Sequence, residues 1–534
     1  MPPLDLPLMT ADTKLEFADA ASCAAWLQTV PLSSVAAAHG RLLDQIGKLD
    51  DFELPAPERL RVLELLSEPG AFVQAEHAKK FAGKPVPLAQ QEEEAFSQVL
   101  ALWHALARGY ERCLEAAAGD AGLAEQIALL CQRALWCAGE RLAEHHKAFR
   151  EIDAENWQAL HRLFAAAEVH GVLDQAVGAS ADRGRPTCLQ TYAHALLLQL
   201  ANDPSEQSPK QLAISSRWLD RWISTVRIGR EPFASALEVA PLMVDLAAAN
   251  GATHQALSGE SVRHFGLDEL AASLRSHAAR LRLGETPQAL GLGEDISAVA
   301  AELHLRTLHR RCCEPPKPRA SGRHATNAAA ELCTGLPAVH YFMTGKPFRQ
   351  PGEDRALSKA QREEIATFGR VATRQEEVHG ALQGFELENW IVRDESLEGL
   401  RIERSEDGGK GRLVLQQLVA VRPSDAKCFM LGVVRWLSAS EKSGLQAGVR
   451  VLPGVPQPVS VRATGVNATR EKHVQAVLLP ALAALHSSAT LVLPTGWYRP
   501  RRVIEVSSDK IEQILLTGIV ERGADFERVS FGAP

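Results

Sequence analysis

The apolar residues of this chain change their spacing near residue 315, and this change constrains the fold more than any other feature. Before it, segments such as 57–66 (PERLRVLELL) and 92–117 place apolar residues three and four positions apart, which is the period of an amphipathic helix. After it, short Val-rich and aromatic segments bounded by Gly, Asp and Ser indicate β-strands. The sequence therefore predicts a multidomain α + β protein rather than one repeated element.

Three regions follow from this pattern in a chain of 534 residues, which is too long for one ordinary core. Residues 1–310 are predicted to form an all-α helical array that looks repeat-like but has no clean repeat period. Residues 311–455 are predicted to form a small antiparallel β-barrel. This region includes a basic, Pro-rich linker at 310–327 before the first strand. Residues 456–534 are predicted to form a second small β-rich module.

Several local predictions belong to this scheme. AVHYFMTG (338–345) is predicted as a strand, and 356–368 as a helix within an insertion. SEDGGKG (405–411) is predicted as a hairpin turn between the strands on either side of it. HVQAVLLPALAALH (473–486) is expected to be a helix or a packed connector.

Composition limits the classes of function. The net charge of −7 argues against a general nucleic-acid binder, because phosphate neutralisation needs a basic surface, although a local arginine cluster still suits one small anionic ligand. The nine cysteines contain no C-x-x-C pair, which favours reduced thiols in a cytoplasmic protein. We also expect no secretory signal and no membrane span, because no long apolar run is present.

One short segment carries residues suited to binding. In ENWIVRDESLEGLRIERS (388–405), two strand-like stretches are joined by DESLEG, which contains Asp394, Ser396 and Gly399. Taken alone, these residues are ordinary turn formers. They are followed by VAVR and by LGVVRWL (431–437), in which Arg435 and Trp436 are candidates to contact a base, although a Trp beside a Val-rich strand is more often a core residue.

The order of these motifs resembles the PilZ domain family of bacterial cyclic di-GMP receptors, over roughly residues 315 to 455. The resemblance rests on Asp394-x-Ser396-x-x-Gly399 and on Leu431–Leu437. It implies a six-stranded barrel that binds cyclic di-GMP, with an R-x-x-x-R pair before the first strand and the D-x-S-x-x-G strand facing the ligand. The N-terminal region is more loosely similar to helical regions attached to PilZ modules in some bacterial proteins.

The chemistry of this ligand explains the residue types. Cyclic di-GMP carries two phosphates and two guanines, and guanidinium groups match both phosphate oxygens and the O6/N7 edge of guanine. A carboxylate accepts from guanine N–H groups, a hydroxyl adds a hydrogen bond, and glycine lets a purine approach the backbone.

Two arginine pairs fit the R-x-x-x-R pattern. Arg319 and Arg323 lie in the linker directly before the first expected strand, where the family places its pair, and we favour them. Arg370 and Arg374 precede Asp394 at a spacing that is also typical of the family, and they are the alternative. If the first pair is used, residues 345–385 are an insertion.

Enzyme readings have little support. The sequence has no G-x-S-x-G, no H-E-x-x-H and no phosphate-binding P-loop spacing, so no catalytic residue is assigned. His145 and His146 are adjacent and do not share a helix face, so no metal site is assigned either, and no cofactor is expected.

Two functions remain. The first is a cyclic di-GMP receptor that relays second-messenger level to a protein partner through its helical region. The alternative is a ligand-free PilZ-type adaptor or scaffold, which mediates protein–protein interactions only.

Overall fold

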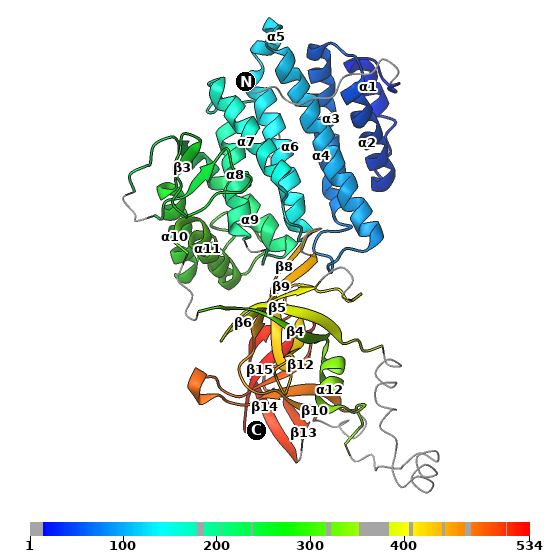
Figure 1. Ribbon diagram of the computed structural model, residues 1–534, viewed down its shortest axis with the longest axis vertical. Coiled ribbons are helices and arrows are strands. Elements are labelled where there is room, and N and C mark those ends of the chain that lie inside the picture. The colour runs from blue at the N-terminus through cyan, green and yellow to red at the C-terminus, as the bar shows by residue number, and fades with distance from the viewer. Residues whose placement is uncertain are drawn as a thin grey trace. The chain divides into compact units, whose positions relative to one another are not determined.

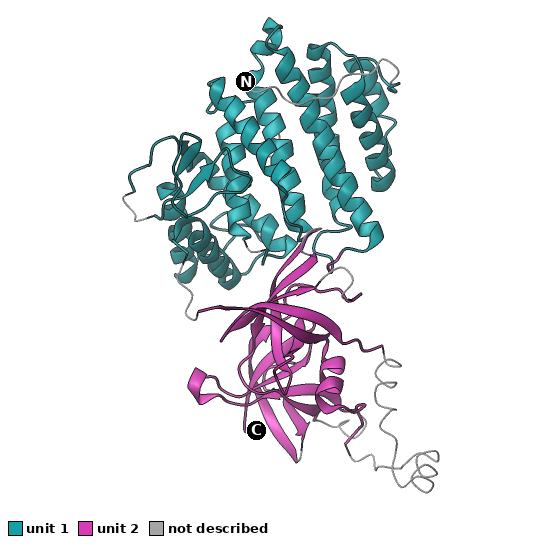
Figure 2. Ribbon diagram, in the orientation of Figure 1, with its two compact units in different colours: residues 1–84, 88–318 teal, residues 85–87, 319–534 magenta. Residues whose placement is uncertain are grey.

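The computed structural model describes residues 14–178, 186–203, 205–235, 239–316, 322–351, 384–404, 409–440, 444–464, 471–508 and 510–534. They form two compact units (Figure 2). The first comprises residues 1–84 and 88–318, and the second comprises 85–87 and 319–534. The predicted helix at 356–368 and the arginines Arg319, Arg370 and Arg374 lie outside the described residues.

The first unit consists mainly of helices, as the apolar spacing predicts (Figure 1). Several begin at side chains that accept hydrogen bonds from the first-turn backbone, including Asp153, Thr187 and Ser208. The helices are α1 (Ala20–Leu27), α2 (Val35–Asp51), α3 (Ala56–Ala78), α4 (Gln90–Ala116), α5 (Ala121–Ala124), α6 (Ile127–Lys147), α7 (Ala154–Val169), α8 (Cys188–Ala201), α9 (Pro209–Trp222), the 3₁₀ turn η1 (Ile223–Thr225), α10 (Asp268–Arg282) and α11 (Ala298–Cys313).

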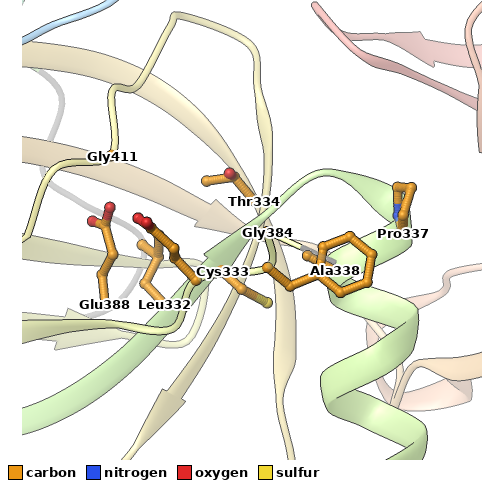
Figure 3. A pocket seen from close by; sticks show the side chains of 10 residues that line it. Leu332, Cys333, Thr334, Pro337, Ala338, Gly384, Glu388 and Gly411 are labelled. Atoms are coloured by element: carbon orange, nitrogen blue, oxygen red, sulfur yellow. The ribbon is translucent and has the colours of Figure 1, made fainter. Parts of the chain in front are cut away.

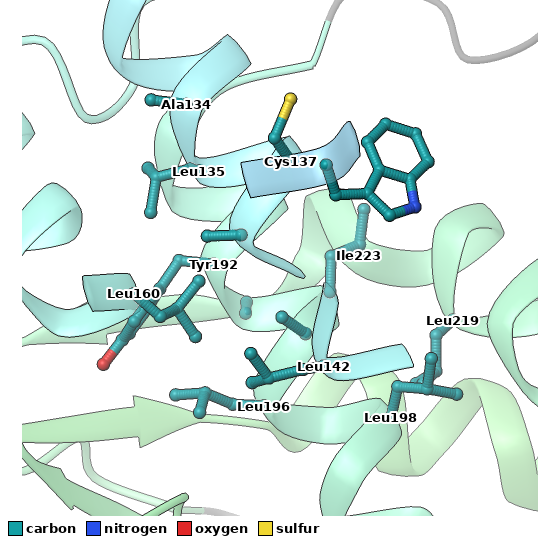
Figure 4. Packing of buried hydrophobic residues seen from close by; sticks show 14 of the residues in the cluster. Ala134, Leu135, Cys137, Leu142, Leu160, Tyr192, Leu196, Leu198, Leu219 and Ile223 are labelled. Atoms are coloured by element: carbon teal, nitrogen blue, oxygen red, sulfur yellow. The ribbon is translucent and has the colours of Figure 1, made fainter. Parts of the chain in front are cut away.

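One continuous hydrophobic core holds these helices together. Figure 4 shows part of this core, in which Leu142 of α6, Leu160 of α7, and Tyr192 and Leu196 of α8 belong to one packed cluster. The Tyr192 hydroxyl lies 2.8 Å from Nδ1 of His161, so its one polar group is satisfied inside the core. Burial of this apolar surface is the main force that stabilises the unit.

The helical region also contains a small sheet, which the all-α prediction for residues 1–310 lacked. Its antiparallel strands are β1 (Arg227–Gly229), β2 (Met243–Asp245) and β3 (Val262–Gly266), in the order β1-β3-β2. The two outer strands have only three residues each, too few for an alternating pattern to stand out in the sequence. None of the helices in the described part of the chain is long and apolar enough to cross a membrane.

The second unit contains two closed antiparallel barrels of six strands each, so the predicted combination of a helical region with a barrel and a further β-rich module is confirmed. The first barrel has the order β4-β5-β6-β9-β8-β7, with β7 pairing back to β4. Its strands are β4 (His324–Thr334), β5 (Glu388–Ser396), β6 (Gly399–Arg404), β7 (Leu418–Pro423), β8 (Met430–Ser440) and β9 (Gly444–Val451).

The second barrel has the order β10-β11-β12-β15-β14-β13. Apolar side chains that alternate along each strand, such as Val459 and Val461, fill its interior. Its strands are β10 (Gln457–Ala463), β11 (Val474–Leu479), β12 (Thr490–Pro494), β13 (Val503–Ser507), β14 (Ile511–Arg522) and β15 (Phe526–Gly532), and the short 3₁₀ turn η4 (Ala483–Leu485) follows β11.

Three local predictions in this unit are wrong. Residues 338–345 belong to the helix α12 (Leu336–Thr344), and 473–486 contain the strand β11 instead of a helix or a connector. Strands β6 and β7, which flank the predicted hairpin turn at 405–411, are not neighbours in the barrel and so do not form a hairpin; residues 405–408 themselves lie outside the described residues. The strands that flank this segment, β6 and β7, pair with β9 and β4, which are distant in the sequence. Local turn residues do not reveal such pairings.

The predicted linker at 310–327 is shorter than expected at both ends. Helix α11 continues through Cys312 and Cys313, whose thiols are buried, and β4 begins at His324. Burial raises the pKa of the Cys312 thiol to about 12, so this vicinal pair lacks the thiolate character of a redox sensor.

The two barrels of the second unit pack against each other through a shared apolar layer. Leu418 and Val433 of the first barrel lie in the same buried cluster as Val477 and Phe526 of the second, together with Val339 of α12. The backbone adds a hydrogen bond from Ala524 N to Gln416 O at 2.8 Å. The first barrel therefore leaves only part of its outer wall open to solvent.

Candidate functional site

The DESLEG segment is a tight hairpin that ends β5 and begins β6. Ser396 pairs directly with Gly399, so only Leu397 and Glu398 make the turn, and the Leu397 side chain is 70% exposed. The Ser396 hydroxyl donates to the Gly399 carbonyl at 3.2 Å. The segment is therefore a turn, and the strands that it joins carry Asp394 and Ser396 on the barrel wall.

A β-bulge decides which way these two side chains point. Trp390 and Val392 are buried inside the barrel, and simple alternation would place Asp394 and Ser396 inside as well. The register of β5 against β6 shifts by one residue between Val392 and Asp394, because two steps on β5 face one step on β6. The extra residue, Arg393, reverses the alternation, and bulges of this kind commonly redirect side chains at binding sites.

After the bulge, Asp394 lies on the outer face of the barrel. It is paired with Arg401, whose neighbours Leu400 and Ile402 point into the interior. Residues that are directly opposite in adjacent strands project to the same face. The same argument places Ser396 on the outer face, beside Gly399.

The outer face continues across the next two strands. One row runs from Asp394 to Arg401, Gly448 and Trp436, and the adjacent row runs from Ser396 to Gly399 and Arg450. Four strands span three inter-strand spacings, or about 14 Å. This wall is wide enough for a ligand of dinucleotide size.

Of the favoured pair Arg319 and Arg323, the described part of the chain contains Arg323, which lies at this wall. Its guanidinium forms an ion pair with the Asp394 carboxylate, and the two side chains are 27% and 20% exposed. The backbone places the pair naturally, since Ala325 at the start of β4 is the register partner of Asp394. Arg323, Asp394, Ser396 and Gly399 are therefore together on one surface of the barrel.

Sequence reasoning missed Arg401. It follows Gly399 by two residues, and a two-residue turn places it opposite Asp394, so the hairpin signal alone was sufficient to find it. Its guanidinium donates to Gln446 Oε1 at 2.8 Å, while its Nε is buried without a hydrogen-bond partner among the described residues. An anion that reached this nitrogen would gain a charged donor.

The neighbouring carboxylate Glu403 pairs with Arg393 and lies within the field of Arg401. Hydrogen bonds from Arg393 lower the pKa of Glu403, and the positive charge of Arg401 lowers it further. The two Arg393–Glu403 contacts are both 2.9 Å long. Glu403 therefore stays ionised at neutral pH and holds the Arg393 guanidinium.

Trp436 is not in the core, contrary to the sequence expectation. A second bulge, between Val434 and Trp436 of β8, reverses the alternation there too and turns the indole onto the outer face. It lies against Gly448, where any side chain would collide with the indole ring. A flat aromatic surface is consequently present at the end of the Asp394 row.

A cavity lies elsewhere in the second unit, away from the outer-face residues (Figure 3). It has a volume of about 230 Å³ and is bordered by Cys333 and Thr334 of β4, Ala338 of α12 and Glu388 of β5. Burial raises the pKa of the Cys333 thiol to about 12, so this thiol is unreactive at neutral pH. None of the residues that line this cavity belongs to the outer-face motif.

Comparison with known proteins gives two family matches at the two ends of the chain. Residues 21–232 match the family described as the cyclic-di-GMP receptor FimW, N-terminal domain, and residues 459–533 match the FimW C-terminal beta-barrel domain. The first match lies in the helical unit and the second covers the strands of the second barrel. The similarity to the FimW family thus occurs in two separate parts of the chain.

A curated relative carries the same name. The cyclic-di-GMP receptor FimW of Pseudomonas aeruginosa is 23% identical over 521 residues, an alignment that covers 88% of this chain and 83% of the relative. The first barrel, which lies between the two family matches, is the part that bears the motif residues.

Proposed function

We propose that this protein is a cyclic di-GMP receptor and that the dinucleotide binds to the outer wall of the first barrel. The observation that carries the proposal is the β5 bulge, which turns Asp394 and Ser396 outward beside Arg323. Support also comes from the similarity to a protein named a cyclic-di-GMP receptor. The PilZ resemblance of residues 315–455 assigns the same ligand to the same residues.

The wall offers groups for both chemical parts of the ligand. The guanidinium groups of Arg323 and Arg401 are suited to phosphate oxygens or to the O6/N7 edge of guanine. Asp394 accepts from the N–H groups of guanine, and Trp436 presents a ring on which a base can stack. The two rows are adjacent, so one ligand can contact both.

The Arg323–Asp394 ion pair gives binding a defined first step. In the structure the two charges satisfy each other, and both side chains are partly exposed. An exposed pair of this kind contributes only about 0–1 kcal/mol, so a phosphate group can replace the carboxylate at small cost. The released Asp394 is then available to guanine.

The remaining assignments are part of the same proposal. Arg319 would complete the pair with Arg323, and Arg370 with Arg374 is the alternative. Ligand binding would be relayed to a protein partner through the helical region. We place the protein in the cytoplasm, without enzymatic activity, without a cofactor and without general nucleic-acid binding.

Isothermal titration calorimetry of the full chain with cyclic di-GMP tests the proposal. We expect saturable binding, and no binding of cyclic di-AMP at the same concentrations, because adenine lacks the O6 acceptor and the N–H donors of guanine. Absence of heat with protein that circular dichroism shows to be folded would overturn the receptor function and favour the ligand-free adaptor.

Variants of the arginines locate the ligand. Arg323→Ala should weaken binding by about 10- to 100-fold, the value of one charged hydrogen-bonding group, whereas Arg374→Ala should have little effect. Arg422→Ala is the matched control, since Arg422 also lies on the first barrel and pairs with Glu331 but is on strand β7. Loss of affinity in Arg374→Ala instead of Arg323→Ala would transfer the role to the alternative pair.

A further inference from the structure

Arg450 joins the ligand wall to the second barrel. It is the register partner of Gly399, in the row that begins with Ser396, and its side chain is 35% exposed. Its guanidinium forms an ion pair with Glu521 of β14, whose side chain is 16% exposed. One arginine of the wall is therefore held by a carboxylate that the other barrel supplies.

Glu521 occupies a fixed position between two arginines. On its own sheet it is the register partner of Arg528, a buried residue whose Nε donates to Thr490 Oγ1 at 2.9 Å. The barrels are also connected close to this point, where Leu418 N donates to Asp525 Oδ1 at 2.9 Å. The shared apolar layer and these bonds hold the strand that carries Glu521 against the first barrel, so the backbone at Glu521 stays in place if the Arg450 side chain turns toward the ligand.

Two arginines and one carboxylate leave this cluster with an excess of positive charge. A phosphate lying over Ser396 and Gly399 would approach the same guanidinium that Glu521 holds. The Arg450 side chain is exposed enough to be reached from solvent, and the second barrel covers Glu521 more completely. The phosphate and the carboxylate must then compete for one cation.

We propose that Arg450 is a further ligand-binding residue and that Glu521 of the second barrel competes with the ligand phosphate for it, so that the C-terminal barrel limits the affinity of the first. This inference rests on the proposed function. It gives the second barrel a regulatory role at a site that it does not itself form.

The size of the effect follows from the exposure of the ion pair. Partly exposed pairs are worth 0.2–1 kcal/mol, so removal of the competitor should raise the affinity for cyclic di-GMP by about 1.5- to 5-fold. Removal of Arg450 should lower it by about 10-fold or more, because a charged hydrogen bond to the phosphate is lost. The two changes have opposite signs although they break the same ion pair.

The test is a double-mutant cycle measured by calorimetry with cyclic di-GMP on the full chain. We expect Glu521→Gln to bind more tightly than the wild type, Arg450→Gln to bind more weakly, and the Glu521→Gln gain to vanish in the double variant. A Glu521→Gln affinity equal to or below that of the wild type, or a gain that persists without Arg450, overturns the competition.

A matched control separates competition for Arg450 from a general effect of removing a negative charge from the second barrel. Glu505 of the same barrel pairs with Arg462 at 2.7 Å and with His473, away from the wall strands, so Glu505→Gln should leave the affinity unchanged. Glu521→Ala serves as a second variant if Glu521→Gln unfolds in thermal denaturation.

The outcomes also distinguish this inference from the proposed function. If the wild type does not bind cyclic di-GMP, the receptor function fails and the competition fails with it. If the wild type binds and the Glu521 variants bind equally well, only the competition is wrong.

Discussion

Gly399, the glycine of the D-x-S-x-x-G motif, has a packing role that needs no ligand. A Cβ atom at this position would lie 2.8 Å from the carbonyl oxygen of Val449 on the neighbouring strand β9. This oxygen belongs to the backbone of a paired strand, so it cannot move aside as easily as the end of a flexible side chain. The close approach of β6 to β9 therefore requires glycine, whatever else the wall binds.

Gly399→Ala should consequently destabilise the second unit by about 1–3 kcal/mol, the usual cost of an overpacked site. Chemical denaturation without ligand measures this. Gly322→Ala is the control, because an added Cβ there meets no atom within 4 Å. An unchanged free energy of unfolding for Gly399→Ala would mean that the barrel tolerates the methyl group and that the glycine serves the ligand alone.

At the scale of single residues, the sequence predicted the positions that form the wall better than their orientation. Asp394 and Ser396 were expected to face a ligand only through a family resemblance, since alternation from Trp390 points them inward. A bulge adds one residue to one strand, and no local signal marks where that occurs. Arg450 was not predictable, because its place beside Gly399 depends on the pairing of strands that are distant in sequence.

Among the elements of the first barrel, β5 and β6 share a buried ion pair. Glu388 of β5 accepts from Arg404 of β6 at 2.6 Å and from the Trp390 indole at 3.0 Å. The Arg404 and Glu388 side chains are 3% and 9% exposed. A buried charge whose partner is removed is strongly unfavourable, so this pair fixes the two strands that carry the motif.

Glu388→Gln should lower the free energy of unfolding by about 3–5 kcal/mol, because it leaves the Arg404 charge buried and unpaired. Glu331→Gln breaks the Arg422 pair on the surface of the same barrel, where both side chains are 37% exposed, and should cost about 0–1 kcal/mol. Urea denaturation followed by tryptophan fluorescence compares the two variants. Equal losses would contradict the assignment of the Glu388 pair as the buried one.

The elements that the sequence misjudged fail for identifiable reasons. The segment AVHYFMTG has the β-branched and aromatic residues of a strand, yet it forms helix α12, because Pro337 lies in its first turn and Gly345 ends it in a left-handed conformation. Strand β11 was obscured by the Ala- and Leu-rich residues that follow it. Capping residues therefore carried more information here than the propensities of the residues between them.

At the scale of the whole molecule, the helical unit contains buried histidines that make its stability depend on pH. Burial lowers the pKa values of His77, His146 and His304 to about 4, from an ordinary value of 6.5. The folded state thus keeps these rings neutral, while the unfolded chain binds protons as the pH falls below 6.5. Their contribution to stability is complete above that pH and decreases as the pH falls toward 4.

The helical unit should therefore lose about 1–2 kcal/mol per buried histidine between pH 6.5 and about 5, a range in which most carboxylates remain ionised. Thermal unfolding followed by far-ultraviolet circular dichroism measures the slope. His77→Gln should flatten it, and substitution of the exposed His170 by Gln should not. A stability that is constant over this range would contradict the buried, neutral state of these rings.

Closure of both barrels has a consequence for assembly. A strand at the rim of an open sheet presents unpaired N–H and C=O groups, and another polypeptide can extend the sheet there. In each barrel the first and last members of the sheet are hydrogen-bonded to each other, which removes that opportunity from the paired strands. A protein that docks on the paired strands of these barrels therefore recognises them through side chains, and single substitutions at those surface residues can alter its specificity.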